Sequence, residues 1–326
     1  MIGRAVLGLV LGPLVAAASA ARAQEAPEPR AHHEVVHHAG QKRTYLLGGS
    51  TLRGDSYHYF DDVWSWTGTS WARVDSLPFP RSSHRVVYDA GRRALVLFGG
   101  GSDGTFAGDG ALWEWREGTW SRLGENPDAG RAEPGLCYDA KRRRIVAFGG
   151  WDGANEFSGT TWEWTGEALE PRDVPGPLPR AGHAFVFDPV RERCLLFGGR
   201  GEGGFHADTW EWDGASWRRI ETAGPSARWF FGAATDPANG RVVVFGGSGP
   251  DGDLGDTWAW GGDGWEVLAR EGPAARGMAK LAFDGSGILL FGGRSQLAEG
   301  FRDHADTWVL RDGRWARVDS PTLPTE

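Results

Sequence analysis

Four histidines near the N-terminus form the densest set of candidate metal ligands in the chain. His32-His33 and His37-His38 bracket a short segment that is expected to be a strand. Imidazole groups at this density could bind Zn²⁺ or Cu²⁺. Because successive side chains of a strand point to opposite faces, adjacent histidines cannot all reach one ion. We therefore assign no metal here, although residues 32–38 remain a candidate ligand set.

Three aspartates supply oxygen ligands of the kind that Ca²⁺ prefers. Asp251 and Asp253 are followed by Asp256, but the bidentate Glu that completes such loops is missing at the expected spacing. The sequence also shows no nucleophile–base motif and no phosphate-binding loop. We therefore predict no metal, no cofactor and no catalytic residue.

The elements that position these side chains follow from an internal repeat. Six times, a leading Arg precedes an apolar segment ending in an aromatic residue and Asp, a second apolar segment ending in Gly-Gly, and a Trp-x-Trp motif, with some substitutions. The Gly-Gly pairs begin at Gly48, Gly99, Gly149, Gly198, Gly246 and Gly292. A period near 50 residues is typical of four-stranded propeller blades. We predict an all-β, six-bladed β-propeller of four-stranded antiparallel blades over residues 30–318.

Gly-Gly after an apolar strand, with a downstream Trp on the fourth strand, resembles the Kelch repeat in its Trp-rich bacterial form. The resemblance covers residues 30–318. It implies a propeller but not one function, because Kelch propellers include binding platforms, a copper oxidase and a sugar mutarotase. The copper site of galactose oxidase requires a Tyr cross-linked to a Cys, and none of its residues can be matched here.

Residues that recur from copy to copy are explained most simply by the blade itself. The leading arginines, and an Asp two residues before the first Trp in four copies, predict structural Arg–Asp pairs. The histidines three residues after an Arg are expected to be structural as well, and the repeated tryptophans should be mostly buried between blades. The residues concerned are Arg30, Arg81, Arg131, Arg180, Arg228, Arg276, Asp62, Asp208, Asp256, Asp306, His33, His84 and His183.

Function is expected where the copies depart from the repeat. The loops between second and third strands and the connections between blades share one face, which we call the variable-loop face. Loops on a rigid scaffold often carry binding, and aromatic side chains beside charged ones suit a sugar or an exposed peptide. Local packing of these aromatics against neighbouring blades is the alternative. The candidate ligand-binding residues are Tyr57, Tyr59, Trp151, Asp152, Phe205, His206, Trp229, Arg302 and His304, and Phe106 lies in an equivalent loop.

The chain contains two cysteines, and both occupy apolar positions of the repeat. Cys137 aligns with Val87 of the second copy, and Cys194 aligns with Leu95. Two buried thiols and a disulfide between neighbouring blades both fit this placement.

The N-terminus predicts export. Arg4, an apolar run over residues 5–18 and Ala21-Arg22-Ala23 are typical of a signal peptide, here residues 1–23, with cleavage after Ala20 as the alternative. The run is too short for a membrane span of about 20 residues. Removing it changes the net charge from −8 to −10, because two Arg leave, and nothing in that balance favours nucleic acid. Residues 24–29 form a short linker and residues 319–326 a C-terminal tail.

Together these features predict a secreted or periplasmic, monomeric, non-catalytic propeller that binds a carbohydrate or a protein segment through its variable-loop face. No nucleic-acid partner and no membrane span are expected. The alternative is a carbohydrate-active enzyme resembling a Kelch-type sialate mutarotase.

Overall fold

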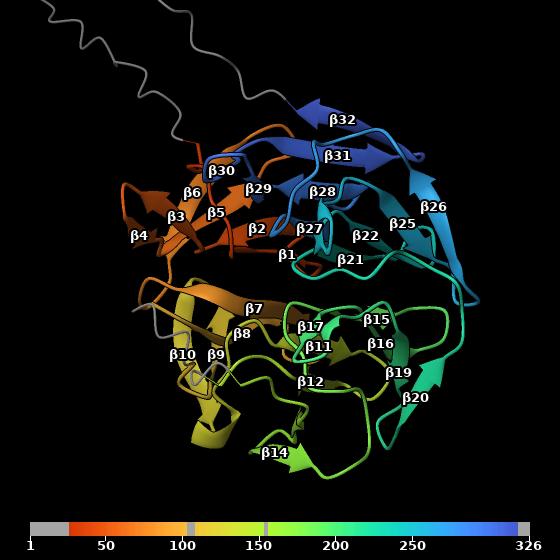
Figure 1. Cartoon of the computed structure of the whole chain (residues 1–326). Coiled ribbons are helices and arrows are strands. Elements are labelled where there is room, and N and C mark those ends of the chain that lie inside the picture. The colour runs from red at the N-terminus through yellow and green to blue at the C-terminus, as the bar shows by residue number, and fades with distance from the viewer. Residues whose placement is uncertain (1–25, 103–107, 153–155, 319–326) are drawn as a thin grey trace, which may run out of the picture.

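The computed structural model describes residues 26–102, 108–152 and 156–318. The proposed signal peptide, Phe106 and the C-terminal tail lie outside the described residues. Within these ranges no helix is long and apolar enough to cross a lipid bilayer. Six four-stranded antiparallel sheets surround one axis (Figure 1), which confirms the six-bladed propeller.

The first three blades follow one another along the chain. Blade 1 consists of β1 (Glu34–His38), β2 (Arg43–Leu47), β5 (Asp62–Trp66) and β6 (Trp71–Ser76). Blade 2 consists of β7 (Ser82–Asp89), β8 (Ala94–Gly101), β9 (Ala111–Arg116) and β10 (Thr119–Glu125). Blade 3 consists of β11 (Gly135–Asp139), β12 (Arg144–Phe148), β13 (Thr161–Trp164) and β14 (Leu169–Arg172). A 3-10 turn, η1 (Pro127–Ala129), connects blades 2 and 3.

The other three blades repeat the pattern. Blade 4 consists of β15 (Ala184–Asp188), β16 (Arg193–Phe197), β19 (Thr209–Trp212) and β20 (Trp217–Ile220). Blade 5 consists of β21 (Gly232–Asp236), β22 (Arg241–Phe245), β25 (Thr257–Trp260) and β26 (Trp265–Ala269). Blade 6 consists of β27 (Lys280–Phe283), β28 (Ile288–Phe291), β31 (Thr307–Arg311) and β32 (Arg314–Val318).

Four small hairpins extend the loops between second and third strands on the variable-loop face. They are β3–β4 (Ser50–Arg53, Ser56–Tyr59) in blade 1, β17–β18 (Arg200–Gly201, Gly204–Phe205) in blade 4, β23–β24 (Ser248–Gly249, Gly252–Asp253) in blade 5 and β29–β30 (Arg294–Gln296, Phe301–Asp303) in blade 6.

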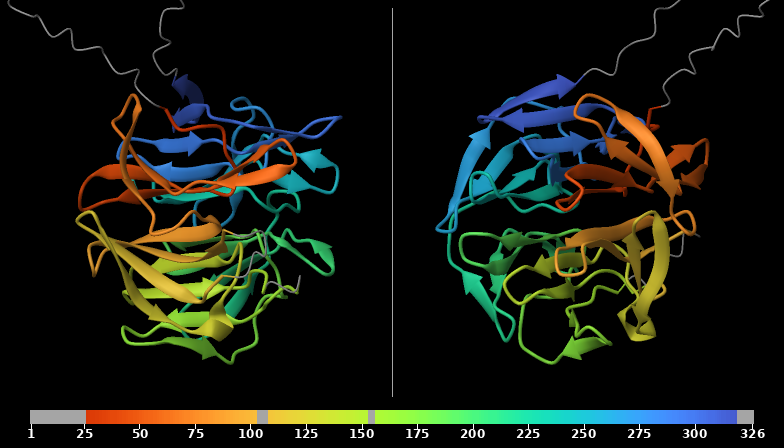
Figure 2. Two further views of the ribbon diagram at one scale, coloured as in Figure 1. Left: turned by 90° about the vertical axis from the view of Figure 1, so that its left-hand side faces the viewer. Right: turned by 180° about the vertical axis from the view of Figure 1, so that it is seen from behind.

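The chain begins on an inner strand and ends on an outer strand, as predicted. The first strands of neighbouring blades contact one another around the axis, and β27 contacts β1. Blades 1 and 6, red-orange and blue, therefore lie side by side in every view (Figures 1 and 2). Each blade is one continuous stretch of chain, so the ring closes without a strand shared between the two termini.

Second strands are buried on both faces, as their continuous apolar sequences predict. In β16, Leu195 packs with Val242 of blade 5, while Leu196 packs with Phe148 of blade 3. Both leucines are almost completely buried. Each sheet is thus held between two others.

The Gly-Gly pairs form the contact between neighbouring blades. The N–H of each second glycine donates to the carbonyl of the next blade's leading Arg, at 2.8–3.0 Å in all six blades. Gly293 donates to Arg30 and closes the ring. The first glycine faces the same carbonyl, because a Cβ on Gly149 would lie 2.4 Å from the oxygen of Arg180. Gly-Gly therefore permits two backbones to meet directly.

Four of the six leading arginines form the predicted structural Arg–Asp pairs. Arg180 donates to both oxygens of Asp208 at 2.5 and 3.0 Å and to the Gly198 carbonyl at 3.0 Å. Arg30, Arg228 and Arg276 make the same pairs with Asp62, Asp256 and Asp306. Each pair fixes the loop between the second and third strands of its own blade.

Tryptophans are buried to different degrees. The second Trp of each pair is buried in all five blades that carry it, as with Trp212 and Trp260. Trp210 and Trp258, however, are half-buried, and each Nε1 donates to the aspartate two residues earlier, which is paired with the leading Arg. The prediction of mostly buried tryptophans therefore holds best for the second position.

In four blades, the first tryptophan of the fourth strand bonds to the preceding blade. Trp217 Nε1 donates to Thr161 Oγ1 at 2.9 Å, and Trp71 does the same to Thr307 across the closure between blades 1 and 6. Trp120 of blade 2 does not, because blade 1 has Val63 in place of the acceptor threonine. Blade 3 has Leu169 at this position, and blade 2 has Leu112 where the acceptor would stand. The interface between blades 2 and 3 therefore lacks both the tryptophan donor and the threonine acceptor of this hydrogen bond.

We expect Gly149→Ala to destabilise the protein more than Gly118→Ala. Both glycines have positive φ, +66° and +82°, but a Cβ on Gly118 would meet nothing within 4 Å. Gly118→Ala should cost about 1–2 kcal/mol for the left-handed backbone alone. Gly149→Ala should cost about 1–3 kcal/mol more, because a blade must shift. Chemical denaturation measures the free energy of unfolding of both variants. Equal losses of stability would show that the close contact of Gly149 with the next blade adds nothing to the cost of a side chain.

Candidate functional site

Three of the predicted residues meet on the variable-loop face, although they come from three different blades. Trp151 follows the Gly-Gly of blade 3, Phe205 ends β18 of blade 4, and Trp229 follows the leading Arg of blade 5. The ring centroids of Trp151 and Trp229 are 5.8 Å apart and those of Phe205 and Trp229 are 6.1 Å apart, both in edge-to-face geometry. This arrangement stabilises aromatic pairs.

Two further aromatics complete this group. Phe157 lies 5.7 Å from Trp151, and Phe230 lies 6.0 Å from Trp151 and 4.0 Å from Trp229. We call these five residues, Trp151, Phe157, Phe205, Trp229 and Phe230, the aromatic cluster. Phe230 is adjacent to the predicted Trp229 in the sequence, and Phe157 lies six residues after Trp151; neither is among the predicted ligand-binding residues.

An arginine that the sequence did not select belongs to the same group. The Arg200 guanidinium lies 5.0 Å from the ring centroid of Trp229 and 5.4 Å from that of Phe205. Cation–π contacts of this kind hold a guanidinium over an aromatic face. Arg200 is nevertheless exposed to solvent.

Tyr57 belongs to a second group, on blades 1 and 6. Its ring lies 6.4 Å from that of Tyr59 and 5.7 Å from the guanidinium of Arg294. Phe301 lies 5.5 Å from the same guanidinium. Asp303 accepts from Arg294 at 2.6 and 2.9 Å and from Thr51 of blade 1 at 2.8 Å. The predicted residues therefore divide between two groups.

The remaining predicted residues lie beside these groups. Asp152 is half-buried next to Trp151, and Arg302 is exposed on β30. Burial lowers the pKa of both His206 and His304 from its usual range. His304 Nε2 lies 2.8 Å from Ser295 Oγ. Both histidines are therefore neutral polar groups near pH 7.

A ring of unusual backbone conformation surrounds the axis beneath the face. The residue two positions after each leading Arg has φ between +50° and +64° in all six blades. Five successive hydrogen bonds of 2.5–3.2 Å join these positions from blade 1 to blade 6. The residues are His32, Ser83, Glu133, Gly182, Phe230 and Met278. Only one is glycine, so the strain is imposed by the closed ring.

Charged side chains fill the centre of this ring. Glu133 accepts from Arg85 at 2.6 Å and lies 2.6 Å from His32 Nδ1. Glu34 accepts from Arg85 at 3.1 Å and from Lys280 at 2.8 Å. His32 also contacts the aromatic cluster, with its ring 5.5 Å from that of Phe230. The aromatic cluster is thus in contact, through His32, with the charged side chains at this end of the central channel, which we call the channel mouth.

Glu133 is ionised in this environment. Burial opposes its ionisation, but Arg85 and then His32 and Lys280 hold the pKa of the carboxyl well below its usual range. A carboxylate so strongly stabilised is a weak proton acceptor. Its arrangement favours an ion-pair network over a general base.

The central channel contains a cavity of about 350 Å³. Its far end is lined by the residue that precedes the turn Asp or His in each first strand: His37, Tyr88, Tyr138, Phe187, Thr235 and Phe283. These positions recur in every repeat, so the sequence does not distinguish them from structural residues. The sequence feature that marks most of these positions is an aromatic residue immediately before the turn Asp.

The histidines of residues 32–38 have separate partners. His33 Nε2 lies 3.1 Å from the Phe291 carbonyl, His37 Nδ1 lies 3.0 Å from Thr44 Oγ1, and the Gln41 N–H donates to His38 Nδ1. Asp256, from the other candidate set, is bound to Arg228. Among the described residues, no group of three or more His, Cys, Asp or Glu side chains is placed to hold a metal ion.

Three repeat histidines are completely buried beside the channel mouth. Burial, and next the neighbouring leading Arg, holds the pKa of His33, His84 and His183 well below its usual range. The His183 ring packs 5.6 Å from Phe148. These histidines are therefore neutral in the folded protein.

No protein-family model and no curated protein sequence matches this chain.

We expect the stability of the protein to fall as the pH decreases below about 6.5, the ordinary histidine pKa. With a lowered pKa in the folded state, a histidine binds a proton more readily in the unfolded state, so acid favours unfolding. Each such residue contributes about 1.4 kcal/mol per pH unit. His183→Phe should remove one contribution, because blade 5 carries Phe231 at the same position. Denaturant titrations between pH 7.5 and 5 measure the slope, and an unchanged slope would contradict a neutral His183.

Proposed function

We propose that this propeller is an exported, non-catalytic binding module that recognises a carbohydrate or a protein segment through its variable-loop face. The Kelch-like repeat supplies the scaffold. The compartment follows from the signal-peptide pattern of residues 1–23.

The observation that carries this proposal is the aromatic cluster. Trp151 and Trp229 are the two tryptophans that lie outside the repeat, and their rings meet although 78 positions of chain separate them. Both remain half-buried, so part of each ring faces solvent. Partly exposed tryptophans on rigid loops are effective binding anchors.

Binding is favoured over turnover because the acid of the second group and the acid at the channel mouth are already paired. Asp303 accepts two hydrogen bonds from Arg294, and Glu133 lies between Arg85 and His32. A general base or acid needs a pKa near the working pH, whereas the pKa of Glu133 is held well below its usual range.

One observation favours the second candidate, a carbohydrate-active enzyme resembling a sialate mutarotase. The aromatic cluster adjoins acidic and basic groups at the channel mouth through the contact of Phe230 with His32. A sugar bound on the cluster could then reach a proton donor or acceptor. If this candidate were correct, Asp152→Asn, at the carboxylate next to Trp151, would reduce turnover while leaving binding intact.

We expect the double variant Trp151→Ala, Trp229→Ala to lose binding. Each anchor should contribute about 2 kcal/mol, or about 30-fold in affinity. Glycan and peptide arrays identify a ligand, and calorimetry compares the variants. Val190→Ala serves as the control, because Val190 is exposed on the turn between β15 and β16, away from the cluster. If the double variant bound its ligand unchanged, the central channel or the short-turn face would replace this site.

A further inference from the structure

Two arginines occupy one repeat position but have different partners. Arg200 and Arg294 both stand two residues after the first glycine of their Gly-Gly pair. Both begin a hairpin on the variable-loop face, β17–β18 and β29–β30. Each guanidinium also lies over two aromatic rings. The two hairpins therefore provide a comparison within one molecule.

The difference lies in the residue that faces the guanidinium. In blade 6, Arg294 is paired across the hairpin with Asp303, which neutralises its charge through two hydrogen bonds. In blade 4, Arg200 is paired across the hairpin with Phe205. Asp303 precedes His304, and Phe205 likewise precedes His206. An aromatic residue has thus taken the place of the acid.

Arg200 consequently presents its charge to solvent. Within residues 26–102, 108–152 and 156–318, no carboxylate forms an ion pair with its guanidinium, which is held in place by Trp229 and Phe205. A guanidinium held on an aromatic face keeps its N–H donors free at the edge, where they bind carboxylates in bidentate geometry.

We infer that the aromatic cluster binds an acidic sugar, a pyranose that carries a carboxylate, with Arg200 as the group that recognises the charge. This inference rests on the proposed function and specifies its ligand class. The sugar ring would stack on Trp151, because Phe230 and Arg200 already lie against the Trp229 ring, and its carboxylate would accept from Arg200.

The geometry favours a sugar over an acidic peptide. Arg200 lies 5.0 Å from the Trp229 ring, and Trp229 lies 5.8 Å from Trp151. A uronic acid carries its carboxylate directly on the pyranose ring, so one rigid residue can contact an aromatic face and the guanidinium together. An Asp or Glu side chain would reach Arg200 through flexible methylene groups, with an entropy cost on binding.

The test uses galacturonate, glucuronate and mannuronate oligosaccharides together with their methyl esters, which keep the sugar and remove the charge. The wild-type protein should bind at least one acid about tenfold more tightly than its ester, the effect of one charge-assisted hydrogen-bond pair. Arg200→Gln should lower the affinity for that acid to the value for the ester. The matched control is Arg219→Gln, which removes one exposed charge from the outer strand of the same blade and should change the affinity less than twofold.

The outcomes separate this inference from the proposed function. Equal binding of every acid and its ester, lost in the Trp151 and Trp229 variants, would overturn the charge recognition and retain the binding site. Arg200-dependent binding of a poly-glutamate peptide alone would overturn the sugar class in favour of an acidic protein segment. Binding of neither sugars nor peptides would overturn both proposals.

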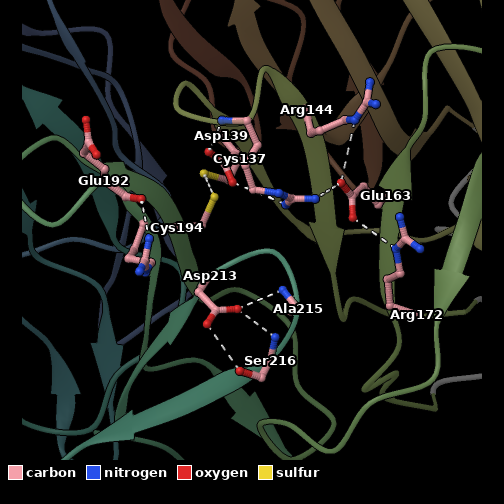
Figure 3. A network of polar contacts seen from close by, with 12 residues as sticks. Cys137, Asp139, Arg144, Glu163, Arg172, Glu192, Cys194, Asp213, Ala215 and Ser216 are labelled. Atoms are coloured by element: carbon pink, nitrogen blue, oxygen red, sulfur yellow. Dashed lines mark hydrogen bonds and ion pairs between the residues drawn. The ribbon is translucent and has the colours of Figure 1, made fainter.

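A separate observation concerns the two cysteines, which lie on neighbouring blades. Cys137 is on β11 of blade 3 and Cys194 is on β16 of blade 4. Their Sγ atoms are 2.6 Å apart (Figure 3), and both side chains are buried. Burial raises the pKa of both thiols. Because the thiolate is the reactive form, oxidation of the folded protein should be slow.

We propose that Cys137 and Cys194 form a disulfide between blades 3 and 4 while the chain folds. The thiolate of one cysteine attacks the disulfide of an oxidant, such as a thiol–disulfide oxidoreductase, and releases one oxidant thiol. The second cysteine then displaces the other oxidant thiol. The two cysteines lose two protons and two electrons, and the oxidant disulfide is reduced to two thiols.

Refolding the unfolded chain with oxidised or with reduced glutathione tests this proposal. After oxidative refolding, denaturation and alkylation, mass spectrometry should find no modified cysteine, and the protein should melt several degrees higher than the reduced form. The control is Cys137→Val, Cys194→Leu, which carries the residues of the equivalent positions in blade 2 and should melt at one temperature in both buffers. Two alkylated cysteines after oxidative refolding would overturn the proposal.

Discussion

The contact between a Gly-Gly pair and the next blade's arginine carbonyl is the interaction on which the propeller depends. It recurs six times and joins the last blade to the first. A side chain at the first glycine would occupy the space of that carbonyl. Because no strand within residues 26–318 is shared between the first and last blades, this hydrogen bond, the Trp71–Thr307 bond and apolar packing close the ring.

The same contact explains why the leading arginines are not a binding site. Their carbonyls hold the neighbouring blade, and five of their guanidinium groups each pair with an aspartate of their own blade. With the backbone fixed at both ends, the loop after each Gly-Gly can vary in sequence without altering the blade. The aromatic cluster and the Arg294–Asp303 pair are two results of that freedom on one scaffold.

Much of the site was visible as departures from the repeat, but its arrangement was not. Trp151, Phe205 and Trp229 were selected because they break the pattern, and they meet in the structure. Tyr57, selected on the same grounds, lies instead beside Arg294 of blade 6. The sequence does not predict Phe157, Phe230 or Arg200, because their part in the site depends on contacts with Trp151, Trp229 and Phe205 that arise only in the folded chain.

The sequence by itself determined the six blades, their strand order and the arginine–aspartate pairs, because each depends on short-range spacing that recurs in every copy. Only the tertiary structure decided which loops meet, that the Arg200 guanidinium has no carboxylate partner among the described residues, and which side chains line the channel. Ring closure brings residues from different blades together, as with Phe230 and His32. The backbone ring at the channel mouth also imposes positive φ on residues such as Glu133, whose type gives no sign of it.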